Sequence, residues 1–220
     1  MQGEPADAGA RHGRADRPAG GAVGVRGHRQ PAGGGGQVTG GGLLVAGAVA
    51  GAGAFTLRAV DPAADAGLLH GWMNDPEVAA YWEMAQPEER IAAYLREQVG
   101  SAHSTPYVGC VGGVPVSYWE LYRADLDPLR HHYPARPRDA GVHLLLGPPA
   151  HRGRGLGTAL LRAVSDWLLR TDPYAGRVVA EPDVRNERSV RAFERAGFRL
   201  VRRIDLPTKR AALMVRERAA

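Results

Sequence analysis

His151-Arg-Gly-Arg-Gly-Leu-Gly-Thr158 is the stretch that decides the predicted fold. It follows an apolar run at residues 142–146, which is typical of a buried strand, and precedes residues 156–169, whose apolar side chains recur at helical spacing. Glycines let a backbone turn tightly and approach a ligand, and free N–H groups at a helix N-terminus attract anions. The stretch therefore predicts a phosphate-binding turn. It is neither a Walker loop nor a dinucleotide fingerprint, because Gly-Lys-Ser/Thr and Gly-x-Gly-x-x-Gly are both missing.

Hydrophobic periodicity and capping residues predict the elements on both sides of this turn. Asp61-Pro62, Asp75-Pro76 and Pro87-Glu88 each mark a helix start, and Gly112-Gly113 is typical of a two-residue hairpin loop. Upstream we expect a strand, three short helices, a hairpin and a strand, at residues 55–60, 61–72, 75–82, 87–99, 107–122 and 142–146. Downstream we expect a helix, a strand, a helix and two strands, at residues 156–169, 177–181, 186–196, 198–204 and 211–215. This order predicts a three-layer α/β fold, with a mixed central sheet flanked by helices.

Composition and charge limit the function classes. The 220 residues carry 28 Lys and Arg against 23 Asp and Glu, a net charge of +5, and Lys209 is the only lysine. This modest excess, without a long basic run, does not demand nucleic acid, and it suits a small anionic ligand such as one with phosphates. Cys110 is the single cysteine, so a disulfide framework and a Cys-rich zinc site are excluded. The chain is compatible with a reducing compartment, and we expect a cytoplasmic protein in which Cys110 packs in a strand.

Residues 1–53 differ in composition from the rest of the chain. They hold 17 of the 30 glycines, with much Ala, Pro and Arg, which is typical of a disordered low-complexity tail. Upstream sequence translated from a wrong start would look the same. The apolar run at residues 43–55 is too short to span a bilayer and lies too far from Met1 to be an ordinary secretory signal. We therefore expect a tail at 1–53, a folded domain at 54–220 and no membrane segment.

In its surroundings, Arg152-x-x-Gly155-x-Gly157 resembles the acyl-CoA pyrophosphate signature of the GNAT acyltransferases. Residues 186–198 resemble the Asn…Gly-Phe segment of the same superfamily, and the resemblance covers residues 55–218. It implies the GNAT fold, acyl-CoA as co-substrate, a pyrophosphate held by backbone N–H groups of the turn, and a pantetheine arm beside the preceding strand. The implied acyl-CoA-binding residues are Leu144, Leu146, Arg152, Gly153, Arg154, Gly155, Leu156, Gly157, Thr158 and Asn186.

Further stretches resemble the siderophore acyltransferases, the GNAT group that includes the mycobactin lysine N-acyltransferase and the hydroxylysine- and hydroxycadaverine-acylating enzymes. These stretches are His70-Gly-Trp-Met-Asn-Asp-Pro76, Trp82-Glu83, Tyr118-Trp-Glu-Leu-Tyr122, Asp139-Ala-Gly-Val-His143 and Glu181-Pro-Asp-Val-Arg-Asn186. The group's proposed catalytic pair is a histidine on the strand before the CoA loop and an aspartate before the Asn-containing helix. The resemblance implies His143 and Asp183 in these roles.

The chemistry of acyl transfer agrees with that pair. An amine or hydroxylamine that attacks a thioester must lose a proton, and a histidine with an ordinary pKa of about 6.5 suits a general base near neutral pH. Strand alternation puts His143 on the same face as Leu145 and opposite Leu144. Asp183 could orient the base, hold a cationic amine or act as base itself. The structural alternatives are a core histidine for His143 and a helix cap for Asp183.

Aromatic residues and one carboxylate are expected on the acceptor side, where they would suit a long aliphatic amine. The expected substrate-binding residues are His70, Trp72, Trp82, Trp119 and Glu120. Core packing of each tryptophan, and a strand-edge position for Glu120, are the alternatives. The pair His131-His132 has no accompanying set of spaced carboxylates or cysteines, so we expect no metal.

The resemblance implies direct acyl transfer from acyl-CoA to the side-chain N6 of lysine, N6-hydroxylysine or a related diamine, in hydroxamate siderophore assembly. A small amine or hydroxylamine and other enzymes of siderophore biosynthesis are the expected partners. An acyl-enzyme on Cys110 is not favoured, because Cys110 is not expected beside a base. An aminoglycoside N-acetyltransferase and a non-catalytic acyl-CoA sensor are the alternative functions. Acyl length and the exact acceptor stay open.

Overall fold

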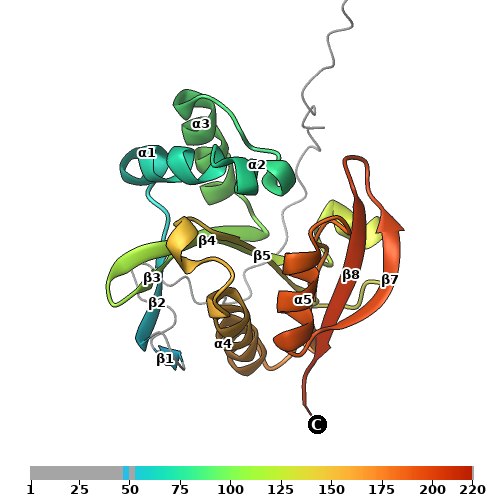
Figure 1. The fold of residues 1–220 in the computed structure, drawn as a ribbon. Coiled ribbons are helices and arrows are strands. Elements are labelled where there is room, and N and C mark those ends of the chain that lie inside the picture. Colours follow the sequence, from blue (N-terminus) through green and yellow to red (C-terminus); the bar gives the residue numbers. More distant parts are fainter. Residues whose placement is uncertain (1–46, 50–52, 220) are drawn as a thin grey trace, which may run out of the picture. The chain divides into compact units, whose positions relative to one another are not determined.

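The structure, a computed structural model, describes residues 47–49 and 53–219, all of which belong to one unit of the chain, Val38–Ala220 (Figure 1). Its strands form one sheet in the order β1-β2-β3-β4-β5-β6-β8-β7. The strands are β1 (Gly47–Val49), β2 (Gly53–Ala59), β3 (Ser104–Val111), β4 (Val114–Arg123), β5 (Ala140–Leu146), β6 (Arg177–Ala180), β7 (Arg199–Asp205) and β8 (Arg210–Glu217). The helices are α1 (Pro62–Met73), α2 (Pro76–Trp82), α3 (Glu88–Val99), α4 (Leu156–Thr171) and α5 (Glu187–Arg195), with short 3-10 turns η1 (Pro128–His131) and η2 (Pro149–His151).

The predicted α/β fold with a mixed central sheet is confirmed, and every predicted helix and strand is present within a few residues of its expected bounds. Asp61 caps α1 by accepting a hydrogen bond from the Ala63 N–H at 2.9 Å, and Asp75 caps α2 in the same way. One difference concerns the predicted tail. Strand β1 falls inside it and pairs antiparallel with β2, whereas residues 1–46 and 50–52 lie outside the described residues.

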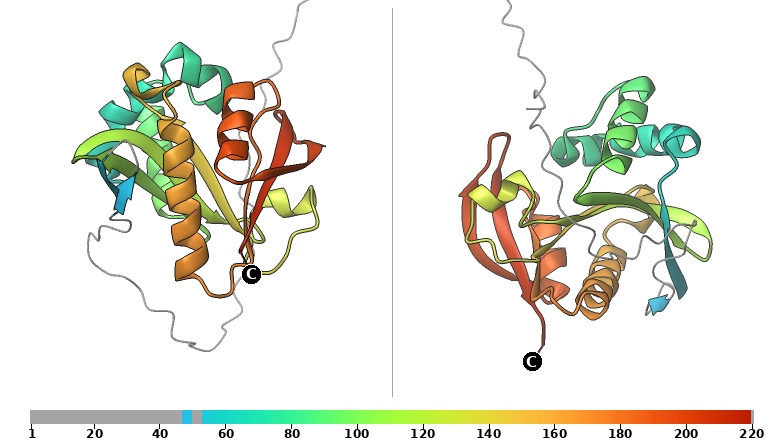
Figure 2. Two further views of the ribbon diagram at one scale, coloured as in Figure 1. Left: turned by 60° about the horizontal axis from the view of Figure 1, so that its bottom comes forward. Right: turned by 180° about the vertical axis from the view of Figure 1, so that it is seen from behind.

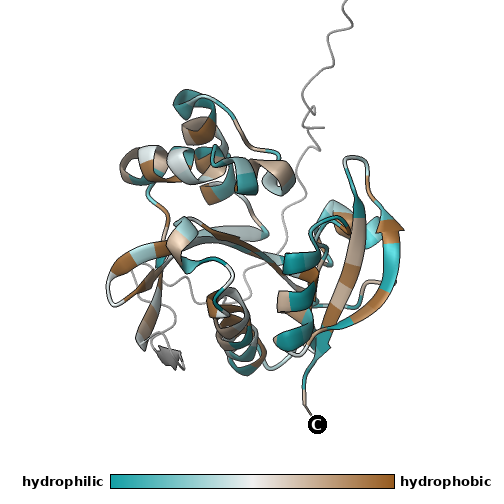
Figure 3. Ribbon diagram, viewed as in Figure 1, coloured by the Kyte–Doolittle hydropathy of each residue, from teal (hydrophilic) through white to brown (hydrophobic). Residues whose placement is uncertain are grey.

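Helices cover both faces of the sheet (Figure 2). Helices α1 and α3 pack on one face, around Leu69, Leu95 and Tyr118, and the Cys110 thiol is buried in the same cluster. Helices α4 and α5 pack on the other face, around Leu160 and a larger set of apolar side chains. In Figure 3 the ribbon of α5 is mostly hydrophilic, because only its inner side meets the core. None of the helices in the described ranges has the length and apolar composition needed to cross a bilayer.

The sheet opens between β5 and β6. These strands are parallel, and they pair only at Ala140 with Val178 and at Gly141 with Val179. Strand β5 then continues to Leu146 while β6 ends at Ala180, so the backbone beyond Gly141 has no partner strand on that side. This divergence leaves the edges of both strands open at the centre of the sheet.

Candidate active site

A cleft of about 740 Å³ occupies the gap between β5 and β6. One wall is the second half of β5, residues 142–146, and the opposite wall is the segment 180–183 that follows β6. The turn before α4, the first turns of α5 and the exposed side of α2 complete the lining. His143 and Leu146 are three residues apart, which is about 10 Å along a strand, so the cleft joins the predicted catalytic histidine to the predicted phosphate turn.

The predicted phosphate turn has the geometry of an anion site. Gly153 and Gly155 have φ angles of +72° and +82°, in the left-handed region that favours glycine. The first hydrogen bond of α4 runs from the Ala159 N–H to the Gly155 carbonyl at 3.1 Å. The N–H groups of Leu156, Gly157 and Thr158 therefore have no acceptor within the helix, and the positive end of the helix dipole adds to their attraction for an anion.

Most predicted acyl-CoA-binding residues line the cleft. They are Leu144, Leu146, Arg152, Gly153, Gly155, Gly157, Thr158 and Asn186. The Leu156 side chain packs on the larger core instead, and the Arg154 side chain is exposed, so the structure places neither side chain on the cleft wall. Asn186 caps α5, because its side chain accepts a hydrogen bond from the Ser189 N–H at 3.1 Å.

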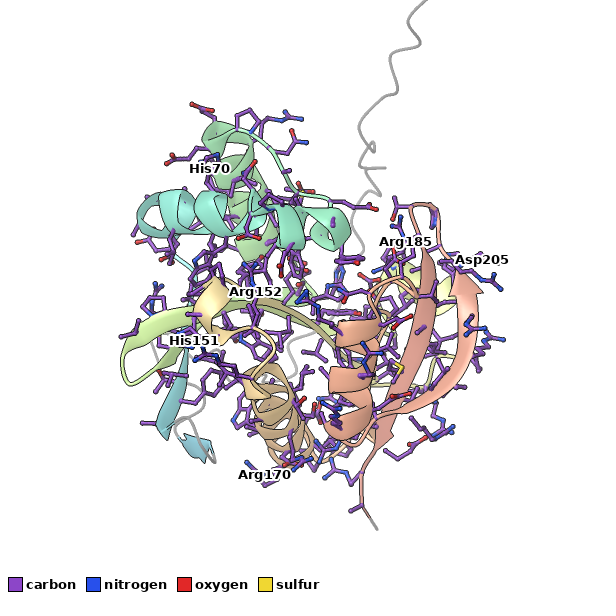
Figure 4. All side chains as sticks on the ribbon, viewed as in Figure 1. His70, His151, Arg152, Arg170, Arg185 and Asp205 are labelled. Carbon is purple, nitrogen blue, oxygen red and sulfur yellow. The ribbon has the colours of Figure 1, made fainter. Side chains whose placement is uncertain are left out.

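The Arg152 side chain points away from the anion site. Its Nε donates to the Leu146 carbonyl at 3.1 Å, and its other nitrogens donate to the Gly147 carbonyl and, at 2.8 Å, to Asp75 Oδ1. In Figure 4 Arg152 lies at the end of β5, whereas Arg185 lies across the cleft beside β8. Because Asp75 caps α2, the guanidinium ties the turn to the end of β5 and to the start of α2. Its backbone, rather than its side chain, belongs to the anion site.

The charges on the cleft wall favour an anionic ligand. The basic side chains are Arg152, Arg185, Arg188, Arg191, Arg195 and Lys209, and the acidic ones are Glu77, Glu181, Asp183 and Glu187. Leaving His143 aside, six cations against four carboxylates give a charge of +2. Clefts lined by an excess of one sign concentrate ligands of the other sign.

His143 lies between two carboxylates. Glu120 is its register partner on β4, and Glu120 Oε2 lies 2.9 Å from His143 Nδ1. Glu181 Oε1, just beyond β6, lies 2.5 Å from His143 Nε2, and the Tyr122 hydroxyl donates to the other Glu181 oxygen at 2.9 Å. A hydrogen bond from each ring nitrogen to a carboxylate requires an N–H at both nitrogens, which is the imidazolium form. The ring stays one-third exposed, so a ligand in the cleft can reach it.

The two carboxylates shift the proton equilibria of this group. Burial alone would lower the pKa of His143, but the charge of Glu181 and the hydrogen bonds to both carboxylates outweigh it and raise that pKa to about 10. Burial alone would raise the pKa of Glu181, but the charge and hydrogen bond of His143 hold it down at about 2. At neutral pH the structure therefore does not favour the neutral histidine base that the sequence predicts. The structure favours an imidazolium paired with an ionised Glu181.

Glu120 differs from its predicted role. Its side chain is buried behind the His143 ring, where the Tyr118 hydroxyl donates to Glu120 Oε1 at 2.9 Å and the Tyr94 hydroxyl donates to the same oxygen. Burial would raise the pKa of Glu120, but the hydrogen bond from His143 lowers it. Glu120 therefore holds the histidine from below the cleft surface and does not contribute to the acceptor wall.

Asp183 lines the same cleft as His143 but is bound to another partner. Both of its oxygens accept hydrogen bonds from Arg185, with Asp183 Oδ2 2.6 Å from Arg185 Nη2, and these bonds lower the pKa of Asp183. Among the hydrogen bonds of the described residues, none joins Asp183 to His143. The helix cap is Asn186, so the capping alternative for Asp183 does not hold either.

Of the predicted acceptor residues, only Trp82 lines the cleft. Its ring packs edge-on against His143, with centroids 6.3 Å apart. Trp119 is fully buried in the larger core, on the α4 face of the sheet, where its Nε1 donates to Ser117 Oγ. Trp72 is buried against Gly147, and His70 lies at the end of α1 outside the cleft wall (Figure 4). The structure does not support acceptor contacts for Trp72, Trp119 and His70. Both tryptophans are packed in the core, and His70 does not line the cleft.

Glu181 and Tyr122 belong to the hydrogen-bonded group around His143, and sequence reasoning missed both. Glu181 is the last residue of the predicted strand at 177–181 and opens the stretch Glu181-Pro-Asp-Val-Arg-Asn186, and that position was the available signal. Tyr122 ends the β4 hairpin strand, and its ring covers Gly141 on β5, where a Cβ would lie 2.2 Å from the ring. Both residues reach His143 only through the pairing of β4, β5 and β6.

Comparison with known proteins identifies the family of this chain. Residues 61–206 match the model of the acetyltransferase (GNAT) domain. The chain is 39% identical over 164 residues to the N(6)-hydroxylysine O-acetyltransferase of Escherichia coli, covering 74% of this chain and 52% of the relative. It is 36% identical over 159 residues to the lysine N-acyltransferase MbtK of Mycolicibacterium paratuberculosis, covering 72% of each chain.

The crystal structure of aminoglycoside acetyltransferase AAC(6')-Ib in complex with coenzyme A superposes with a TM-score of 0.68 at 27% identity, covering 74% of this chain and 95% of that one. This chain spans about half of the length of the Escherichia coli relative. The matched domain nevertheless includes α1 and every residue that lines the cleft except Lys209. The chain belongs to the GNAT acetyltransferase family.

Proposed function

We propose that the protein is an acyl-CoA-dependent N-acyltransferase that acylates the side-chain nitrogen of lysine, N6-hydroxylysine or a related diamine in hydroxamate siderophore assembly. The observation that carries this proposal is the cleft itself, which has an anion site at the start of α4 and the Glu181 and His143 pair on its wall. Acyl-CoA supplies an activated acyl group, so no metal is required. The N–H groups of residues 156–158 would hold its pyrophosphate, and the second half of β5 would run beside its pantetheine.

The pair can move the protons that the reaction requires. When the neutral acceptor nitrogen attacks the thioester carbonyl, a C–N bond forms, the C–S bond breaks, and the nitrogen loses one proton; a lysine ammonium must give up a further proton to solvent before the attack. Glu181 lies on the cleft wall against His143, so it receives the proton of the nitrogen while the His143 imidazolium gives one to the departing thiolate, and proton transfer from Glu181 to His143 restores the pair. Because the two groups are strongly coupled, they act as one unit with shared titration. Asp183 and Arg185 are proposed to orient the acceptor.

Two relatives support the acceptor class. One, at 39% identity, is named N(6)-hydroxylysine O-acetyltransferase, and the other, at 36% identity, is named lysine N-acyltransferase MbtK, so both names contain a lysine-type acceptor. The single cysteine, Cys110, is free, which is compatible with a reducing compartment and supports the proposed cytoplasmic location. An N-hydroxylase and the enzymes that use the hydroxamate product are the proposed pathway partners.

An aminoglycoside acceptor is the alternative suggested by the 27% identical structure. A polycationic aminoglycoside calls for carboxylates that are free to pair with it. In the described part of the chain, every carboxylate on the cleft wall already has a cationic partner. The pairs are Glu77 with Arg188, Glu181 with His143, Asp183 with Arg185, and Glu187 with Arg191. The cleft therefore favours an acceptor with few positive charges, such as lysine or a hydroxylated diamine, over an aminoglycoside.

The test is CoA-thiol release by the full chain with acetyl-, succinyl- and long-chain acyl-CoA. The acceptor panel contains lysine, N6-hydroxylysine, N-hydroxycadaverine, N5-hydroxyornithine and an aminoglycoside. We expect turnover with the lysine-like or diamine acceptors. Turnover confined to the aminoglycoside would replace this proposal, and acyl-CoA binding without turnover on any acceptor would favour a sensor. The His143→Ala variant separates an enzyme from a sensor. An enzyme loses CoA release in this variant, whereas a sensor keeps its acyl-CoA binding and its signal.

A further inference from the structure

Lys209 provides the only side-chain amine in the whole chain. It lies in the turn between β7 and β8, where its carbonyl accepts a hydrogen bond from the Leu206 N–H at 2.9 Å. The side chain is about one-fifth exposed and lines the cleft. The next residue, Arg210, is well exposed and pairs with Asp205, so the two neighbouring cations have different surroundings.

The Lys209 amine lies beside the proposed proton acceptor. Lys209 Nζ is 3.7 Å from Glu181 Oε1, and the same oxygen is 2.5 Å from His143 Nε2. An acceptor nitrogen that gives its proton to Glu181 must come within about 3 Å of that carboxylate. Lys209 Nζ therefore lies within about 1 Å of the separation that the reaction requires of a substrate amine.

We propose that Lys209 is an acylation site of this protein, modified in its own cleft when acyl-CoA is present and no acceptor is bound. The proposal rests on the proposed function, since it needs acyl-CoA in the cleft. Lys209 Nζ attacks the thioester carbonyl, the new C–N bond replaces the C–S bond, and CoA leaves as its thiol. The Lys209 ammonium first gives one proton to solvent, and its neutral amine then attacks. The second proton lost by the nitrogen passes to Glu181, and His143 protonates the thiolate. The products are N6-acyl-Lys209 and free CoA.

Acylation would change the site in two ways. The amide carries no charge, so the ion pair with Glu181 is lost, and the acyl group adds bulk where an acceptor amine must approach. A modified chain should therefore acylate its acceptor more slowly than an unmodified one. An acceptor that fills the same space should in turn protect Lys209.

The experiment follows the intact mass of the full chain during incubation with acetyl-CoA alone, with the site mapped by peptide mass spectrometry. We expect one added acetyl group, on Lys209, and a labelling rate that saturates with acetyl-CoA. That rate should fall about tenfold or more when acceptor is present at saturation, and also in the Glu181→Gln variant. The Lys209→Arg variant should gain no side-chain acetyl group. The double variant Lys209→Arg, Arg210→Lys is the matched control, because it moves the single lysine by one residue to an exposed position, and it should react at the rate of the urea-unfolded chain.

Two outcomes overturn the inference. One is labelling of native Lys209 no faster than in the unfolded chain, and the other is equal labelling of the relocated lysine. A parallel assay with lysine and N6-hydroxylysine acceptors separates the inference from the function on which it rests. CoA release with acceptor but no Lys209 acylation refutes the inference alone, whereas absence of both acyl-CoA binding and CoA release refutes the proposed function and the inference with it.

Discussion

Glu120 and His143 face each other across the β4–β5 ladder, and Glu120 Oε2 lies 2.9 Å from His143 Nδ1. Two tyrosine hydroxyls fix Glu120 from the other side, so the carboxylate and the ring have little freedom. Glu181 approaches the opposite ring nitrogen from the neighbouring strand and reaches the cleft. The histidine is therefore positioned from within the protein by one carboxylate and lines the cleft beside the other.

Replacing Glu120 tests its role as a positioning residue. The Glu120→Gln variant keeps the shape of the side chain and an oxygen for both tyrosines, but it removes the charge that stabilises the imidazolium. The pKa of His143 should fall, so the alkaline limb of the kcat profile should move to lower pH by about one unit or more. The pH dependence of CoA release measures this. Glu89→Gln, on the exposed side of α3, is the matched control, and an unchanged profile in Glu120→Gln would contradict the role.

Glu181 and Asp183 are two residues apart and should differ in importance. Removing a group that transfers a proton lowers the rate by about 10²- to 10⁴-fold, which we expect for kcat of Glu181→Gln. Asp183 is already bound to Arg185, so Asp183→Asn should mainly raise KM for the acceptor. Steady-state kinetics with N6-hydroxylysine measures both variants. A larger loss of kcat in Asp183→Asn would return the catalytic role to Asp183.

The shifted pKa values predict how stability depends on pH. The folded-state pKa of His143 is raised from 6.5 to about 10, so its contribution is fully present below 6.5 and is lost as the pH rises to about 10. The pKa of Glu181 is lowered from 4.5 to about 2, so its contribution is present above 4.5 and is lost as the pH falls to about 2. Urea unfolding between pH 7 and 10 should show a steeper decline for the wild type than for His143→Gln. Parallel declines would show that His143 is not held as an imidazolium.

Arg152 should contribute to stability before any ligand binds. Arg152→Lys removes the guanidinium that donates to the Leu146 and Gly147 carbonyls and to Asp75. Leaving a buried acceptor without a donor lowers the free energy of unfolding by about 1–3 kcal/mol. We expect a lower Tm in the absence of CoA, together with weaker CoA binding because the turn loses its brace. Arg154→Lys, in the same turn but exposed, is the control. Weaker CoA binding at an unchanged Tm would instead place the Arg152 guanidinium on the phosphates.

The sequence by itself determined the elements and the anion site. Both depend on local features, because capping by Asp61 and Asp75, the hairpin glycines and the glycines of the phosphate turn act within a few residues of the chain. Strand alternation also placed His143 on the correct face, away from Leu144. The phosphate turn could be predicted because backbone N–H groups, rather than distant side chains, make it.

Only the tertiary structure decided which side chains meet at His143. Glu120, Tyr122 and Glu181 come from three strands whose register fixes their contacts, and no local pattern encodes that register. The same register turned Trp119 into the core, although its neighbour in sequence is a partner of His143. The two carboxylates, which only the assembled sheet brings to the ring, then outweigh burial and favour the imidazolium form of His143 beside an ionised Glu181, the proposed proton acceptor.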